Sequence, residues 1–110
     1  MDIDVYQKRA LETKFYPDNF KVIYPTLGLV GEAGEVAEKV KKIIRDGNGI
    51  ASMTQDQKMH LAFEISDVCW YLAALSDDLG LKLSEIFQMN IAKLADRATR
   101  GKLGGSGSNR

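Results

Sequence analysis

Two pairs of acidic side chains share one spacing. Glu32 and Glu35 are three residues apart, as are Glu64 and Asp67. On helices that advance about 100° per residue, each pair lies on the same flank of an apolar stripe, roughly 60° and 120° around the helix. Antiparallel packing of the two stripes would gather these four carboxylates at one edge of the interface, where their repulsion requires a cation. Oxygen ligands of this kind suit Mg²⁺, with Mn²⁺ as the alternative.

The same acids have a second interpretation. Carboxylates at this spacing are common on solvated helix surfaces, where they pair with lysines such as Lys39, Lys42 and Lys58. Helical phase alone therefore leaves a metal site and a solvated acidic surface both open. Glu38 lies about 180° from the apolar stripe, so we expect it to face solvent, with a supporting role beside the metal ligands as the lesser alternative.

A row of polar and basic side chains follows near the C-terminus. Asn90, Lys93 and Arg97 fall within roughly 60° of one another on a helix, beside an apolar stripe that begins at Phe87. Such a row suits the oxygens of phosphate groups, and a solvated basic face is the alternative. The net charge of zero disfavours binding to polymeric nucleic acid.

The elements that position these residues are predicted to be four amphipathic helices, because strand-type alternation is absent and prolines and glycines divide the chain. We expect helices over about 4–16, 25–46, 55–79 and 84–100, the third beginning at a capping box over 52–55 or 54–57. The predicted fold is all-α, a four-helix bundle with antiparallel neighbours. Residues 1–100 form one domain, and the Gly/Ser-rich residues 101–110 form a flexible tail, either a lid or a linker.

Composition limits where the protein acts. No apolar run approaches the roughly 20 residues that a membrane helix needs. The N-terminus lacks the basic region and apolar core of a secretory signal, so we expect a cytoplasmic protein. The single cysteine, Cys69, has no partner for a disulfide or a zinc site.

Several segments together resemble the MazG-type nucleotide pyrophosphohydrolases. They are GLVGEAGEVAE (28–38), EISDVCWYL (64–72), NIAKLADR (90–97) and RGKLGGSGSNR (100–110). The family signature is Glu-Glu-x-x-Glu, a spacer, and Glu-x-x-Asp. This chain departs from it at Gly31, which replaces the first glutamate, so a ligand or general base that some members have is missing.

The resemblance implies an α-helical enzyme that cuts a nucleoside or deoxynucleoside triphosphate between its α- and β-phosphates. The products are a nucleoside monophosphate and pyrophosphate, as in enzymes that sanitise nucleotide pools. It also implies a homodimer or homotetramer. Mg²⁺ would be held by the four acids of the two pairs, and either Glu35 or Glu38 would accept the proton of the attacking water, Glu35 being favoured by its phase.

The resemblance also suggests substrate contacts. The phosphates would be bound by Asn90, Lys93 and Arg97, with Arg110 closing from the tail, and the nucleoside by Tyr71. Trp70 is a candidate for contact with a partner subunit. Three residues of the first helix are candidates for reading the base, namely Tyr6, Gln7 and Thr13.

Two non-enzymatic alternatives remain. A carboxylate bundle that only binds metal, such as a di-iron protein, is disfavoured because His60 precedes Glu64 and does not follow a glutamate by three residues. A helical adaptor explains the amphipathic helices but not the matched acidic pairs.

Overall fold

The computed structural model describes residues 1–47 and 49–101. They contain four α-helices, two short 3₁₀ helices and no strand, which confirms the predicted all-α class. In chain order the elements are α1 (Ile3–Leu11), η1 (Asp18–Phe20), α2 (Ile23–Arg45), η2 (Ile50–Ser52), α3 (Gln55–Asp78) and α4 (Leu83–Thr99). None of the described helices is long and apolar enough to cross a membrane.

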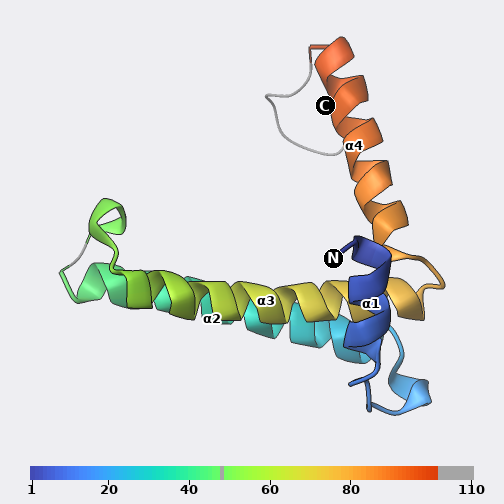
Figure 1. The fold of residues 1–110 in the computed structure, drawn as a ribbon, viewed down its shortest axis with the longest axis horizontal. Helices are drawn as coiled ribbons and strands as arrows, with labels where there is room; N and C mark the ends of the chain where they lie inside the picture. Colours follow the sequence, from blue (N-terminus) through green and yellow to red (C-terminus); the bar gives the residue numbers. More distant parts are fainter. Residues whose placement is uncertain (48, 102–110) are drawn as a thin grey trace.

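The two longest helices, α2 and α3, lie side by side as an antiparallel hairpin (Figure 1). The face of α2 that turns toward α3 carries Pro25, Val36 and Ile43, of which Pro25 and Ile43 are buried. On α3 the most buried residues, Ala73 and Ala74, are small and allow close packing at its C-terminal end. The hairpin is the scaffold that carries both acidic pairs.

Helix α1 packs across the C-terminal end of α3 (Figure 1). Its buried Gln7 side chain donates from Nε2 to the carbonyls of Ala73 (3.1 Å) and Leu81 (3.4 Å). Gln7 Oε1 accepts from the Leu83 N–H at 2.9 Å. This amide therefore joins α1 to the turn between α3 and α4, and these contacts replace the base-reading role that we expected for Gln7.

Helix α4 projects away from the hairpin (Figure 1). Leu83 at its start is buried, but from Phe87 to Arg100 every residue is exposed except Arg97, which is partly covered. The four expected helices are present, yet the last does not lie along the other three. The radius of gyration is 16.9 Å, whereas a compact chain of this length has a value of about 13 Å.

Two helix boundaries show how local chemistry acts. The first helix ends at Leu11, five residues before the predicted end. There the N–H groups of Glu12, Thr13 and Lys14 bond to carbonyls three residues back, which replaces the α-helical pattern by tighter turns of the 3₁₀ type. The third begins at the second of the two predicted capping boxes. There Thr54 and Gln57 each accept a hydrogen bond from the other's backbone N–H.

Candidate functional site

Three of the four predicted carboxylates converge on the hairpin. Glu32 comes from α2, and Glu64 and Asp67 come from one face of α3. One oxygen from each side chain lies within 4.8 Å of the others. Glu32 and Glu64 are partly buried, whereas Asp67 is exposed. We call these three residues the carboxylate cluster.

The electrostatic environment of the cluster acts on the pKa of Glu32. Burial raises the pKa of Glu32, and the negative charges of Asp67, Glu64 and Glu35 raise it further. The protein alone thus leaves like charges close together on a partly dry surface, and a divalent cation would relieve this repulsion. Because all the donors are carboxylate oxygens, the cluster fits a hard cation such as Mg²⁺ or Mn²⁺.

The other two predicted acids of α2 lie outside the cluster. Glu35 is exposed and near enough for its charge to act on Glu32, but its oxygens are not among those within 4.8 Å. Glu38 is exposed and accepts a hydrogen bond from Lys41 at 2.9 Å, which lowers the pKa of Glu38. The contact face of α2 runs through Glu32 itself, so residues three and six positions later turn outward.

A pocket of about 320 Å³ adjoins the cluster. Glu32 and Asp67 form part of its wall, so the pocket and the cluster share two side chains. Most of the remaining lining is aromatic. The other lining residues are Thr13, Phe15, Tyr16, Tyr24, Trp70 and Tyr71. We call this cavity the aromatic pocket.

Stacked rings build the aromatic pocket. Tyr16 stacks on Tyr24 with 4.7 Å between ring centroids, and Tyr71 lies 6.5 Å from Tyr24. The Tyr71 ring lies directly over Gly28, where a Cβ atom would come within 2.1 Å of Tyr71 Cε1. Glycine at this position therefore allows the predicted nucleoside-binding tyrosine to occupy its place beside Glu32.

Trp70 contacts its own chain. Its indole N–H donates to the Ala10 carbonyl (3.0 Å) and to Thr13 Oγ1 (2.8 Å), both near the end of α1. These bonds direct the ring toward the pocket wall, whereas the sequence had suggested contact with a partner subunit. They also fix the relative position of α1 and α3 beside the pocket.

The predicted phosphate-binding row lies elsewhere. Asn90 and Lys93 are exposed and Arg97 is partly buried, all on the projecting α4. Because α4 points away from the hairpin (Figure 1), one chain does not bring this row to the carboxylate cluster. Arg110 and the proposed lid lie outside the described residues, apart from Gly101.

Sequence reasoning missed three members of the pocket wall, Phe15, Tyr16 and Tyr24. A signal was present, because each of the two prolines in the chain, Pro17 and Pro25, directly follows one of these tyrosines. Proline fixes φ and favours loops and the first turn of a helix, so the two Tyr-Pro pairs mark chain boundaries: Tyr16 lies in the loop before η1, and Tyr24 lies in the first turn of α2. Neither tyrosine is charged at neutral pH, so the pattern of charged residues gives no indication of them.

Comparison with known proteins agrees with this geometry. Residues 24–101 match the model of the MazG nucleotide pyrophosphohydrolase domain. The chain is also similar to the protein called Gene 37 protein of Mycobacterium phage L5. The two are 46% identical over 116 aligned positions that cover the whole of both chains. No solved structure matches the chain significantly.

Proposed function

Because this chain belongs to the MazG nucleotide pyrophosphohydrolase domain family, we propose that it hydrolyses a nucleoside or deoxynucleoside triphosphate between the α- and β-phosphates. The products are the nucleoside monophosphate and pyrophosphate. One observation carries the proposal, which is that the carboxylate cluster and the aromatic pocket share Glu32 and Asp67. A nucleoside in the pocket would thus have its phosphates beside the cluster.

The cluster is the proposed metal site. Glu32, Glu64 and Asp67 would hold Mg²⁺ or Mn²⁺, and Glu35 would join them after a change of its side-chain rotamer. When bound, the metal supplies charge neutralisation for the triphosphate and lowers the pKa of the attacking water. The raised pKa of Glu32 supports this assignment, because burial is its largest cause and the rest comes from the neighbouring carboxylates, whose repulsion a cation would offset.

Glu35 is the proposed proton acceptor. Water attacks the α-phosphorus, its proton passes to Glu35, the bond to the bridging oxygen breaks, and pyrophosphate leaves. Glu35 is exposed and forms no ion pair with residues 1–47 or 49–101, whereas Glu38 is held by Lys41. Because Gly31 stands where the family has a further glutamate, this role falls to Glu35 in the present proposal.

The nucleoside is assigned to the aromatic pocket. Its volume of about 320 Å³ is at the lower end of the range of roughly 300–1,000 Å³ for small-molecule sites. Tyr71 and Tyr24 offer ring faces for stacking on a base. The acidic side of the pocket would then receive the triphosphate together with its metal.

A homodimer or homotetramer is part of the proposal. Apolar side chains are exposed along the hairpin, among them Val30 at 67% and Phe63 at 65%. Surfaces of this kind on a chain with so small a buried core are typical of subunit interfaces. Association would also let the α4 of one protomer bring its phosphate-binding row of Asn90, Lys93 and Arg97, with Arg110, to the cluster of another. We place the enzyme in the cytoplasm, where nucleoside triphosphates are made and used.

The test is turnover of a panel of NTPs and dNTPs with Mg²⁺, with the products separated by chromatography. We expect monophosphate and pyrophosphate from at least one substrate, and a loss of turnover in Glu35→Gln and Glu64→Gln. Near-wild-type rates in both variants would contradict the assignment of the site. No turnover by a wild-type protein that binds Mg²⁺ would favour the alternative of a non-catalytic metal-binding or adaptor protein.

A further inference from the structure

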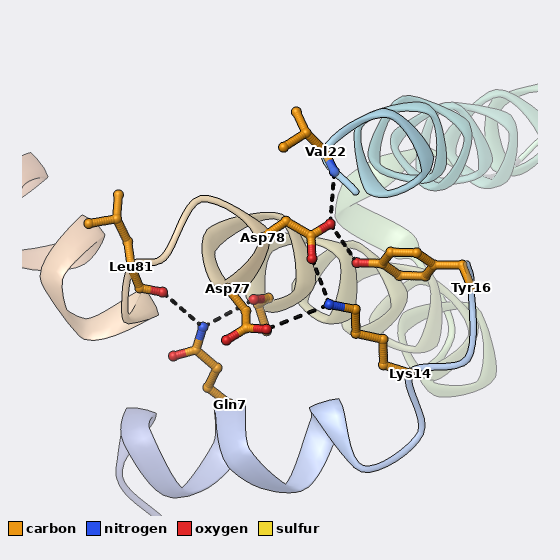
Figure 2. Close-up of polar contacts among 8 residues, drawn as sticks. Gln7, Lys14, Tyr16, Val22, Asp77, Asp78 and Leu81 are labelled. Carbon is orange, nitrogen blue, oxygen red and sulfur yellow. Dashed lines mark hydrogen bonds and ion pairs between the residues drawn. The ribbon is translucent and has the colours of Figure 1, made fainter. Parts of the chain in front are cut away.

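One aspartate outside the carboxylate cluster has a completely buried side chain. The side chain of Asp78, at the end of α3, has 0% exposure, and Lys14 Nζ donates to its Oδ1 at 2.6 Å. Its Oδ2 accepts from the Tyr16 hydroxyl at 2.7 Å and from the Val22 N–H at 2.9 Å. Figure 2 shows these three donors converging on the one carboxylate.

All three donors belong to one segment. Residues 12–22 join α1 to α2, and we call them the 12–22 loop. The three donors, Lys14, Tyr16 and Val22, all lie in this loop. Two hydrogen bonds from side chains and one from the backbone therefore attach this loop to α3. Val22 has a φ of 68°, a left-handed conformation that a β-branched residue rarely adopts. Its bond to Asp78 helps to hold the chain in this conformation just before α2 begins.

The anchored loop carries one side of the aromatic pocket. Thr13, Phe15 and Tyr16 line the pocket, and the Tyr16 ring stacks on Tyr24 at 4.7 Å. The Tyr16 hydroxyl donates to Asp78. The same residue therefore joins the buried carboxylate to the stacked ring of Tyr24. The position of the wall thus depends on a carboxylate that does not itself line the pocket.

We propose that Asp78 is a positioning residue, which holds the 12–22 loop and its aromatic side chains at the distance from Tyr71 that a nucleoside requires. This inference rests on the proposed function, because it assigns the nucleoside to the aromatic pocket. It predicts an effect on substrate binding and little on the chemical step. Asp78 lies outside the carboxylate cluster, so metal binding is unaffected.

The charges around Asp78 are consistent with a permanent anchor. Burial alone would raise the pKa of Asp78, but the bonds from Lys14, Val22 and Tyr16 offset this and leave it below its usual value. Burial, together with the hydrogen bond and charge of Asp78, raises the pKa of Tyr16 to about 12. At neutral pH Asp78 is ionised and Tyr16 keeps its proton, which is the arrangement that the hydrogen bonds require.

The neighbouring aspartate gives a matched control. Asp77 precedes Asp78 and also faces Lys14, but at 3.6 Å, and 49% of its side chain is exposed. An exposed ion pair of this kind contributes little to stability. Asp77→Asn removes the same charge from the same helix turn without touching the bonds to Tyr16 and Val22.

The first experiment measures kcat and KM of Asp78→Asn for the triphosphate that the wild type hydrolyses fastest. We expect KM to rise about tenfold, as for the loss of one charge-assisted hydrogen bond, with kcat changed less than twofold. Asp77→Asn should keep both constants. A double-mutant cycle with Tyr16→Phe should show that the Asp78 effect shrinks once the hydroxyl is absent. Equal KM values in Asp78→Asn and wild type, or full additivity in the cycle, would overturn the proposal.

A second readout does not need activity. Trp70 is the only tryptophan of the chain, and its indole bonds to Thr13 in the anchored segment. Acrylamide quenching of its fluorescence should increase in Asp78→Asn and in Tyr16→Phe, but not in Asp77→Asn. Unchanged quenching in the first two variants would contradict the anchor. If Asp78→Asn does not fold, the KM and the fluorescence quenching of Tyr16→Phe test the proposal. Wild-type values of both would contradict it.

The two proposals fail in different ways. A wild-type protein that releases no pyrophosphate from any triphosphate refutes the proposed function, whatever the quenching shows. A wild-type protein that turns over normally, beside an Asp78→Asn variant with unchanged KM, refutes the role of Asp78 alone.

Discussion

Replacing Glu32 by glutamine should change stability in opposite directions without and with metal. Two unit charges 4.8 Å apart repel by about 0.9 kcal/mol at the dielectric constant of water. Glu32 makes two such pairs in the cluster, and a Debye length of about 8 Å reduces the sum to about 1 kcal/mol. In EDTA, Glu32→Gln should therefore melt about 5 °C above the wild type.

Magnesium should reverse this order. At a free concentration ten times its dissociation constant, a ligand stabilises the folded state by about 1.4 kcal/mol. The wild-type melting temperature should rise accordingly, and that of Glu32→Gln should rise much less because one ligand is lost. Differential scanning fluorimetry in EDTA and across a Mg²⁺ titration measures both effects.

A matched variant on the same helix controls for general effects of charge. Glu38→Gln removes an equal charge, but Glu38 is exposed and paired with Lys41 at 2.9 Å. Its response to Mg²⁺ should equal that of the wild type. The reasoning is refuted if Glu32→Gln is less stable than the wild type in EDTA, or if it keeps the full response to Mg²⁺.

Four further predictions concern packing and pH. Gly28→Ala forces a Cβ atom against a tyrosine ring at 2.1 Å, so it should lower the unfolding free energy by about 1–3 kcal/mol and raise KM. Gly31→Ala, with nothing within 4 Å, should raise that free energy by about 0.5–1 kcal/mol. Gln7→Ala leaves a buried N–H without a partner and should cost about 1–3 kcal/mol in urea unfolding, whereas the exposed Gln88→Ala should be neutral. Because the pKa of Tyr16 is raised from 10.0 to about 12, its contribution to stability is complete below pH 10 and is lost as the pH rises through about 12. Urea unfolding across that pH range should show that the difference in unfolding free energy between the wild type and Tyr16→Phe decreases as the pH rises.

The parts of the account that follow from helical periodicity were accessible from sequence. The apolar stripes of α2 and α3 predicted that Glu32, Glu64 and Asp67 would meet, and the structure brings them within 4.8 Å. The position of Glu35 around the helix was predicted less well. The prediction centred the apolar stripe of α2 on Leu29, whereas the face that contacts α3 runs through Glu32. These two residues are about 60° apart around the helix, and an offset of that size separates a side chain in the cluster from one in solvent.

The rest depends on contacts between distant segments. Tyr16 and Asp78 are 62 residues apart in sequence, and nothing in either local pattern indicates that they bond. The direction of α4 likewise follows from the turn that Gln7 fixes through Leu81 and Leu83, 74 and 76 residues away. Periodicity predicts which face of a helix is apolar, but not which element covers it.

Hydrolysis in ¹⁸O-labelled water, with the products analysed by mass spectrometry, tests the central claim most directly. Attack of water on the α-phosphorus predicts that the label enters the nucleoside monophosphate, with unlabelled pyrophosphate formed in equal amount and both products lost in Glu64→Gln. Label in pyrophosphate or in orthophosphate would contradict the account, since either result requires attack at a different phosphorus.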